Sequence, residues 1–266
     1  HRDLHSFPTR RSSDLSNAGL PVPVVAVGKL GYPDTAERAL RDGMCDMVML
    51  ARPLLADPEW PNKAYAGRVA EIIPCIGDQE GCIGEIFHGA HIQCAVNPRT
   101  GNEHRFGETS LPVTGRRKKI AVVGAGPAGI TCACEAARRG HDVVLFEAGT
   151  RAGGALIPGS VPRIKFDVKN YLDYLEGELA RTARHHLLKM KFRTLATAGA
   201  LKKGSFDAIV TCTGARCRMP GIEGIESRRV VHVIDQLLRP SLMKDARDIV
   251  IIGGGDVGCE AAHFCT

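Results

Sequence analysis

The sequence predicts an α/β protein built from parallel strands, and three features of the chain carry that prediction. Residues 22–51 alternate a short apolar run, a helical stretch and a second apolar run, which is typical of a parallel strand–helix–strand unit. A glycine-rich turn follows an apolar strand within residues 120–129, and a second such turn follows residues 248–252. The composition agrees, because 44% of the 266 residues are hydrophobic and 24% are charged, as in globular proteins.

Charge and cysteine content exclude several classes of protein. The net charge of +6 is scattered, and the aromatic residues (5%) do not interleave with basic ones, so no nucleic-acid partner is expected. There is no recognisable signal peptide and no apolar run near 18 residues, so no membrane partner is expected either. The ten cysteines lack the dense pattern of secreted scaffolds, which favours a reducing, cytoplasmic location and metal binding over disulfides.

Both ends of the chain are expected to be cut. Residues 1–15, HRDLHSFPTRRSSDL, show neither helical nor strand periodicity and resemble a translated sequencing adapter, with a disordered native arm as the alternative. Thr266 falls inside what is predicted as the first helix of a nucleotide-binding unit. The sequence therefore predicts a fragment of a longer protein.

Residues 16–74 are predicted to form a parallel strand–helix–strand unit with a closing helix, which the resemblance described below implies to be the end of a barrel. Strands are expected at 22–27 and 45–51, with a helix over 33–43 between them and a closing helix over 57–69. Two strands and two helices bury too little apolar surface to fold alone, so a larger body is expected around them.

The turns after these two strands are candidate anion sites. In parallel barrels the loops after the last two strands often hold a phosphate, and here those loops contain Gly28-Lys29 and Ala51-Arg52. Gly28 lets backbone N–H groups approach an anion, and Arg52 offers a planar, bidentate guanidinium. A turn glycine and a surface arginine are the alternative interpretation.

The clearest unit is residues 118–148, which lie in a domain predicted over 116–225, and it is predicted to bind a dinucleotide. A strand at 120–123 leads into the pattern G-x-G-x-x-G, and a helix follows to about Arg139. The first glycine makes the tight turn, the second admits a pyrophosphate and the third lets helix and strand pack closely, while the amides at the helix start face the phosphates. The residues expected to contact the ligand are Gly124, Gly126, Pro127, Ala128 and Gly129.

An acidic residue completes this pattern. Glu147 ends the next strand, DVVLFE, 18 residues beyond Gly129. Its carboxylate can accept hydrogen bonds from a ribose hydroxyl and repels a 2′-phosphate, so an unphosphorylated adenosine is expected. A tight turn in an ordinary α/β fold is the alternative.

Three further segments follow. A surface helix is predicted over 163–186, with Tyr171 and Tyr174 as packing residues, and a buried strand over 206–215 that ends in Thr213-Gly214. Residues 226–266 are predicted to begin a second nucleotide-binding domain, in which the phosphate loop is formed by Gly253, Gly255 and Gly258.

Two such loops imply two dinucleotides, or one working loop and one relic. Two dinucleotides are the natural number for an enzyme that passes hydride from a nicotinamide to a flavin. The chain ends before any acidic residue that would follow the second loop, so the sequence does not distinguish NADH from NADPH.

The order of these parts resembles the multidomain branch of the Old Yellow Enzyme-like NADH:flavin oxidoreductases. That branch includes 2,4-dienoyl-CoA reductase, trimethylamine dehydrogenase, enoate reductases and the bile-acid-inducible flavin oxidoreductases. The resemblance covers residues 16–266 and rests on VAVGKL, MLARPLLADPEW, the cysteine segment, VVGAGPAG, LFEA, RAGG and TCTGA. It implies the C-terminal end of an FMN-bearing (β/α)8 barrel, an iron–sulfur segment and linker over 75–115, and Rossmann-like domains for FAD and NAD(P)H.

The resemblance also implies roles for individual residues. The FMN phosphate would lie at Gly28, Lys29, Ala51 and Arg52; FAD would contact Gly126, Gly129, Glu147 and Gly154, with Thr213-Gly214 closing over it. Electrons are implied to run from NAD(P)H through FAD and a 4Fe–4S cluster to FMN, and then as hydride to a conjugated double bond. The family's substrate-binding and proton-donating residues lie on earlier barrel strands, so no catalytic residue is named in this chain.

The cysteine segment departs from the family at one position. The family's spacing resembles C-x2-C-x3-C-x11-C; Cys75, Cys82 and Cys94 match its first, third and fourth positions, whereas Asp78 occupies the second. Four interpretations stay open: a 4Fe–4S cluster with Asp78 as a labile ligand, a three-iron cluster on three thiolates, cysteines packed as small hydrophobes, and a structural zinc site. Two nearby histidines, His88 and His91, could in principle ligate a metal, but loop histidines are usually solvated or capping, and that is the expectation here.

Three functions are compatible with these expectations. The first is reduction of an activated C=C bond in a small unsaturated substrate of the enoate or 2,4-dienoyl-CoA type, possibly a CoA thioester. The second is oxidative amine dehydrogenation on the same architecture. The third is a nucleotide-binding electron-transfer or regulatory subunit without a substrate of its own. A homo-oligomer is a further expectation, and the chain alone is expected to be inactive because most of the FMN pocket is missing.

Overall fold

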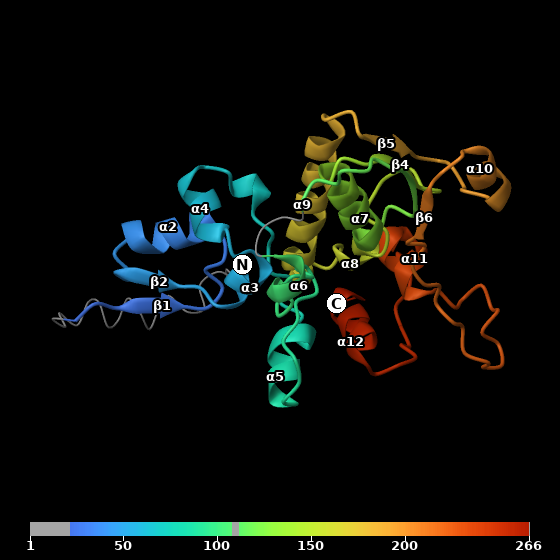
Figure 1. Cartoon of the computed structure of the whole chain (residues 1–266). Helices are drawn as coiled ribbons and strands as arrows, with labels where there is room; N and C mark the ends of the chain where they lie inside the picture. Colours follow the sequence, from blue (N-terminus) through green and yellow to red (C-terminus); the bar gives the residue numbers. More distant parts are fainter. Residues whose placement is uncertain (1–21, 108–111, 266) are drawn as a thin grey trace. The chain divides into compact units, whose positions relative to one another are not determined.

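The computed structural model describes residues 22–107 and 112–265, and the chain divides into two compact units, 1–112 and 113–266 (Figure 1). Residues 1–15, for which an adapter origin is predicted, lie outside the described ranges.

The first unit contains a two-stranded parallel sheet. β1 (Val25–Val27) pairs with β2 (Met47–Met49), and α2 (Pro33–Arg41) connects them. This confirms the predicted strand–helix–strand order, although each strand is shorter than its apolar run because only three residues of each are paired. A small core joins the two strands to the helix, and its buried members are Ala26, Leu30, Ala39 and Cys45.

This sheet leaves apolar side chains uncovered. Val27, Met47 and Met49 are 57%, 48% and 56% exposed. An isolated pair of short strands cannot bury both of its faces, and such pairs are at best marginally stable in water.

Residues 52–71 form three short helices in place of the single helix predicted over 57–69. These are α3 (Arg52–Ala56), α4 (Trp60–Tyr65) and the 3₁₀ turn η2 (Val69–Glu71). The helix prediction is wrong at both ends, since Asp57 adopts an extended conformation and α4 already ends at Tyr65. The Asp57 side chain accepts hydrogen bonds from backbone amides, which competes with continuous helical bonding.

The cysteine segment carries little regular structure. It contains one π-helical turn, η3 (Glu80–Gly84), followed by α5 (Glu85–Phe87), and α6 (Glu103–Phe106) lies further along the chain. π-helical turns are rare in proteins, and those that do occur are often found at functional sites.

The second unit is built on a four-stranded parallel sheet in the order β5-β4-β3-β6. Its strands are β3 (Lys119–Val123), β4 (Asp142–Phe146), β5 (Leu188–Lys191) and β6 (Ala208–Thr211). The long helices α7 (Pro127–Arg138) and α9 (Phe166–Ala183) pack against each other and against the sheet (Figure 1). The core lies between these helices and the sheet, and its largest fully buried side chains are Ile130, Leu145, Val122, Val143 and Cys134.

The helix predicted over 163–186 is confirmed as α9 with the 3₁₀ turn η4 (Arg163–Lys165) before it. Tyr171 is buried, and its ring stacks on that of Tyr174 at a centroid distance of 6.1 Å. The Tyr174 hydroxyl lies 3.1 Å from a Glu178 carboxylate oxygen, and burial raises the pKa of this tyrosine. Both tyrosines therefore pack, as predicted.

Two strands of this sheet differ from the sequence prediction. β5 is absent from it, because the sequence LKMK carries two lysines and no apolar run. β6 was predicted to be buried but lies at the edge of the described sheet, where Ile209 is 48% exposed. The prediction of a buried strand is wrong because apolar composition does not report a strand's place in the sheet.

The rest of the second unit consists of short helices and loops. These elements are α8 (Leu156–Gly159), α10 (Ala198–Lys203), α11 (Val233–Leu238), the 3₁₀ turn η5 (Pro240–Met243) and α12 (Asp256–Cys265). Residues 249–252 form no strand, which corrects the expectation that the second glycine loop repeats the complete strand–turn–helix pattern.

None of the helices within residues 22–107 and 112–265 combines the length and apolar character that crossing a membrane requires.

Candidate functional site

The turn between β3 and α7 depends on two glycines. Gly124 has a φ of +100°, and a Cβ added there would lie 2.3 Å from the Cys212 carbonyl oxygen. A Cβ on Gly129 would lie 1.8 Å from the Gly124 carbonyl oxygen, so no side chain fits at either position. The glycines thus let α7 begin directly above the end of β3, as the pattern predicted.

The start of α7 presents backbone donors. Gly126 is the N-cap residue, no side chain caps this end, and Pro127 occupies the first turn. The first N–H groups of a helix have no partner within the helix, and the helix dipole is positive at this end. In a twelve-residue helix at the carboxyl end of a parallel strand, this arrangement is suited to a diphosphate.

A second loop lies against this turn. The amide of Gly153 donates to the Ala125 carbonyl oxygen at 2.8 Å. Gly154 has a φ of +53°, and a Cβ there would lie 2.9 Å from the Cα of Gly126. The structure therefore brings Gly154 and Gly126, both predicted to contact one ligand, into direct backbone proximity.

The Glu147 carboxylate links the turn after β3 to the loop after β4. Its Oε2 accepts a hydrogen bond from the Ala125 amide at 2.8 Å, and its Oε1 accepts one from the Gly149 amide at 2.6 Å. Each carboxylate oxygen keeps further lone pairs, so the group can accept from a ribose hydroxyl at the same time.

Thr213 and Gly214 follow β6 at the same edge of the sheet. The Cys212 amide donates to the Val123 carbonyl oxygen at 2.8 Å, which seats this segment beside the turn. Gly214 has a φ of +70°, a conformation that favours glycine. The predicted residues on three separate segments thus gather at the carboxyl end of the sheet, where open α/β folds bind ligands.

The second glycine loop has the turn without the sheet. Gly253 has a φ of +117°, and a Cβ on Gly258 would lie 1.9 Å from the Gly253 carbonyl oxygen. α12 follows at once. A Cβ on Gly253 or on Gly255 would meet nothing within 4 Å.

In the first unit, the candidate anion loops lie at the same end of the small sheet. Gly28 and Lys29 follow β1 with φ of +102° and +53°, while Ala51 and Arg52 follow β2. Because β1 and β2 are parallel, these loops leave the sheet at one edge.

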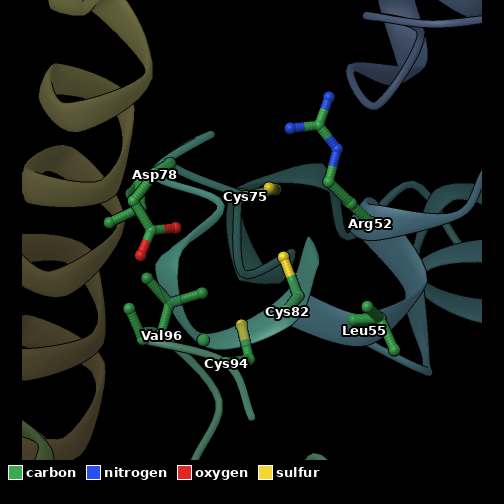
Figure 2. A pocket seen from close by; sticks show the side chains of 10 residues that line it. Arg52, Leu55, Cys75, Asp78, Cys82, Cys94 and Val96 are labelled. Atoms are coloured by element: carbon green, nitrogen blue, oxygen red, sulfur yellow. The ribbon is translucent and has the colours of Figure 1, made fainter. Parts of the chain in front are cut away.

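The same unit brings the predicted metal ligands together. Cys75, Asp78, Cys82 and Cys94 line a single hollow of about 290 Å³, part of which is open solvent. Figure 2 shows the sulfurs of Cys82 and Cys94 pointing toward this space, with Asp78 to one side of them. Arg52 and Leu55 line it as well, and the Arg52 guanidinium is turned away from the sulfurs (Figure 2).

Backbone contacts explain why distant parts of the segment meet here. The Gln93 amide donates to the Gly81 carbonyl oxygen at 2.6 Å. This bond brings together the residues that follow Gly81 and Gln93, which are Cys82 and Cys94. The Leu55 carbonyl oxygen accepts from Asn97 Nδ2 at 2.9 Å and from Thr100 Oγ1 at 2.7 Å.

Asp57 anchors the chain just before Cys75. This buried carboxylate accepts from Lys63 Nζ at 2.7 Å, the Glu59 amide at 3.0 Å and the Ile73 amide at 2.9 Å. The bond to Ile73 holds the chain two residues before Cys75. The sequence prediction missed Asp57 and Leu55, and the only local signal was the sequence ADPEW, which resembles an ordinary helix start.

The donor set suits a soft metal cluster better than one ion. Burial raises the pKa of the Cys94 thiol, the nearby Asp78 and Cys82 raise it further, and the amides of Val96 and Asn97 partly offset this by donating to its sulfur. Within the described ranges, no three His, Cys, Asp or Glu side chains are grouped tightly enough for a single ion. A zinc ion would need its ligands at about 2.0–2.3 Å, whereas an iron–sulfur cluster spreads them around a larger body.

His88 and His91 do not line this hollow. His91 lies instead beside Gly101, where a Cβ would approach its Nε2 to 2.7 Å.

Comparison with known proteins agrees with the second unit's architecture. Residues 118–266 match the family model described as pyridine nucleotide-disulphide oxidoreductase. An NADH oxidase of Thermoanaerobacter brockii is 38% identical over 247 residues, which cover 91% of this chain and 37% of that protein. A cinnamate reductase of Clostridium sporogenes is 36% identical over 241 residues, covering 91% of this chain and 35% of that protein.

Solved structures resemble both units. A 2-naphthoyl-CoA reductase in complex with 2-naphthoyl-CoA matches with a TM-score of 0.82 and 30% identity, over 96% of this chain and 37% of that one. A histamine dehydrogenase from Rhizobium sp. 4-9 matches with a TM-score of 0.69 and 31% identity, over 75% of this chain and 29% of that one. The chain spans between 29% and 37% of the length of these proteins.

Proposed function

The chain belongs to the multidomain Old Yellow Enzyme-like NADH:flavin oxidoreductases, and on that premise we propose that it carries electrons from NAD(P)H to the site where an activated C=C bond is reduced. Flavin and nicotinamide chemistry follows from the family; the individual cofactors, their residues and the substrate are the proposal. The observation that carries it is the gathering of three segments around the start of α7.

FAD is proposed to bind at the carboxyl end of the second unit's sheet. The amides at the start of α7 would hold its diphosphate, Glu147 would orient the ribose, and the backbone at Gly154 and Gly214 would cover the ligand. The close approach of Gly154 to Gly126 supports this assignment. The proposed contacts are Gly124, Gly126, Pro127, Ala128, Gly129, Glu147, Gly154, Thr213 and Gly214.

The other cofactors are proposed at the remaining loops. NAD(P)H would bind at Gly253, Gly255 and Gly258, and the FMN phosphate at Gly28, Lys29, Ala51 and Arg52. A 4Fe–4S cluster would be held by Cys75, Asp78, Cys82 and Cys94, which line one hollow. When bound, these groups would supply the hydride and single-electron steps, while the chain binds and orients them.

This proposal assigns domains to the chain. Residues 16–74 would be the end of an FMN-binding barrel, 75–115 the iron–sulfur segment and linker, 116–225 the FAD domain and 226–266 the start of the NAD(P)H domain. The uncovered apolar side chains of β1 and β2 support the barrel assignment, since the side chains on the inner face of barrel strands pack against those of the other strands.

An unsaturated acid or acyl-CoA is the proposed substrate class. The likeness to a cinnamate reductase and to a 2-naphthoyl-CoA reductase supports it. The likeness to a histamine dehydrogenase supports the second candidate, oxidative amine dehydrogenation. The chain's own residues do not separate the two, because each cofactor loop would serve either direction of electron flow.

The test begins with the full-length protein, purified without oxygen. Its absorption spectrum and its FAD, FMN and iron content are measured, and FAD and ADP are titrated into flavin-free protein. A colourless protein that takes up neither ligand would contradict the proposal.

Substrate tests then separate the candidate functions. Reoxidation of the NADH-reduced flavin by cinnamate or 2-naphthoyl-CoA supports the reductase. Flavin reduction by histamine without NADH supports the amine dehydrogenase. FAD binding with neither reaction supports an electron-transfer subunit.

A further inference from the structure

We propose that the metal position at Asp78 is exchangeable: an iron there leaves on oxidation and returns on reduction, while Cys75, Cys82 and Cys94 retain the rest of the cluster. This inference rests on the proposed function, because it assumes that the hollow holds an iron–sulfur cluster. It adds a change in the iron content of that cluster with its oxidation state, and the other proposed cofactor sites do not depend on this change.

The donor set is uneven. Three of the four side chains that could ligate a cluster here are thiols, and the fourth is a carboxylate. Iron–sulfur clusters favour soft thiolate ligands, whereas carboxylates suit harder ions such as Mg²⁺, Ca²⁺ and Mn²⁺. The iron bound to Asp78 is therefore held less strongly than the iron bound to each cysteine.

Solvent reaches the same position. Cys82 is buried and Cys75 and Cys94 are half-buried, whereas Asp78 is exposed. The weakest ligand is thus the one that water can displace, and ions can enter or leave on that side without opening the cysteine side of the hollow.

Nothing else holds the Asp78 carboxylate in place. Across the part of the chain that the structure describes, no hydrogen bond or ion pair reaches its side chain, in contrast to the Asp57 carboxylate, which accepts from three donors. Asp78 also lies between Gly77 and Gln79, with φ of +73° and +65°. A carboxylate without other partners can bind the metal or turn into solvent at little cost.

The exchange balances in electrons and atoms. One electron passes from the 4Fe–4S core, of charge 2+, to an outer-sphere oxidant such as ferricyanide. The Asp78 oxygen–iron bond and the bonds of that iron to the core sulfides break, Fe²⁺ leaves, and a 3Fe–4S core of charge 1+ remains on three thiolates. The reverse step takes up Fe²⁺ and one electron from dithionite or a reduced flavin. Both forms of cluster that the sequence left open are then states of one site.

The experiment uses the full-length protein, purified without oxygen, with bound FAD as the check that the second unit is intact. Iron per protein and the electron paramagnetic resonance (EPR) spectrum are recorded before and after one equivalent of ferricyanide, and again after dithionite with Fe²⁺. Asp78→Cys supplies the thiolate that the hollow lacks. Glu80→Gln is the matched control, an exposed acid two residues away that does not line the hollow.

The wild type and Glu80→Gln are expected to lose one iron of four, to develop the EPR signal of an oxidised three-iron cluster, and to recover on reduction with Fe²⁺. Asp78→Cys is expected to keep four irons through the same cycle. Uptake of Co²⁺ by the oxidised and then reduced wild type would support the proposal without any variant.

Two results would overturn the inference. If the wild type kept four irons as firmly as Asp78→Cys, the exchangeable position would be refuted while the proposed function stood. If neither protein contained iron although FAD was bound, the cluster itself would be refuted together with the inference.

Discussion

The two glycine-rich turns of the second unit share their local geometry and differ in their surroundings. Gly124 and Gly253 have φ of +100° and +117°, and each places its carbonyl oxygen 1.8–1.9 Å from where a Cβ would stand on Gly129 or Gly258. Around the first turn, β3 is paired on both sides, with β4 and β6. Around the second, residues 249–252 form no strand, and Val250 is 88% exposed.

This difference separates what a turn needs from what a strand needs. Positive φ values and the tight approach of a helix to its own turn depend on glycine within six residues. A strand depends on hydrogen bonds to neighbours that are distant in the sequence; for β3 these are 23 residues away (Lys119 and Asp142) and 88 residues away (Ile120 and Ala208). The turn therefore forms in both places, whereas the sheet forms only where its partners are present.

The largest expected effect comes from an alanine at the third glycine of each turn. Gly129→Ala puts a methyl group into the Gly124 carbonyl oxygen, in a turn that the sheet prevents from relaxing, and is expected to cost about 4 kcal/mol of unfolding free energy and abolish FAD binding. Gly258→Ala makes the same local clash where the surroundings are open, and is expected to cost less than about 1 kcal/mol.

Native-state hydrogen exchange of the β3 and β4 amides checks this pair, because it reports the second unit alone. Gly199→Ala in α10, where a Cβ would meet nothing within 4 Å, is the control. Equal losses of protection for the Gly129 and Gly258 variants would mean that the surroundings restrain the two turns equally, which would contradict the prediction.

The first glycine of each turn gives a sharper test with a smaller effect. Both Gly124→Ala and Gly253→Ala carry the strain of positive φ, about 1 kcal/mol. Only Gly124→Ala also meets the Cys212 carbonyl oxygen, at 2.3 Å, which raises its expected cost to about 3 kcal/mol. Urea unfolding followed by hydrogen exchange measures the difference, and a cost for Gly253→Ala as large as for Gly124→Ala would contradict it.

Glu147 gives an intermediate effect that belongs to the first turn. Glu147→Gln replaces one carboxylate oxygen with an amide nitrogen, which leaves the Ala125 or the Gly149 amide without its acceptor. The expected cost is about 2 kcal/mol, with weaker binding of ADP. Calorimetric titration of ADP checks this, and Glu176→Gln, an exposed acid on α9, is the control.

The smallest effect is expected at the start of β3 and β4. Arg117 donates to both carboxylate oxygens of Asp142, and this hydrogen bonding lowers the pKa of Asp142. The contribution to stability is present above the ordinary aspartate pKa and is lost as the pH falls through the lowered value. Asp142→Asn should therefore lower the melting temperature slightly at neutral pH and not at all in strong acid.

Thermal melting from neutral pH down to strongly acidic pH, at low and at high salt, measures this change. Because the side chains of Arg117 and Asp142 are 60% and 47% exposed, salt should diminish it. A large, salt-independent loss would mean that the pair does more than join two strand ends.

Most elements of the fold could be predicted from local patterns, and the failures share one cause. The glycine turn at 124–129, α7 and α9 each depend on residues that lie within a few positions of one another in the sequence. β5 was missed because Lys189 and Lys191 obscure its apolar side, and β6 was misplaced because its neighbours are set by the whole sheet. The prediction of a helix over 57–69 failed at its start because the backbone of Asp57 is extended, with its carboxylate bound by Lys63 and by the Ile73 amide.

The candidate metal hollow shows the same division. Spacing singled out Cys75, Asp78, Cys82 and Cys94, and the structure lines one hollow with all four. Spacing carried no sign that Asp57 and the Leu55 carbonyl hold the segments before Cys75 and after Cys94, since these contacts span 16 to 45 residues.

By itself, the sequence determined the family, the two turns and the four residues proposed as metal donors, because glycine conformation and donor chemistry belong to single residues and short spacings. Only the tertiary structure decided which turn rests on a sheet, and that Asp78 is exposed whereas Cys82 is buried and Cys75 and Cys94 are half-buried. Burial and strand pairing are set by residues far apart in the chain, and no local pattern records them.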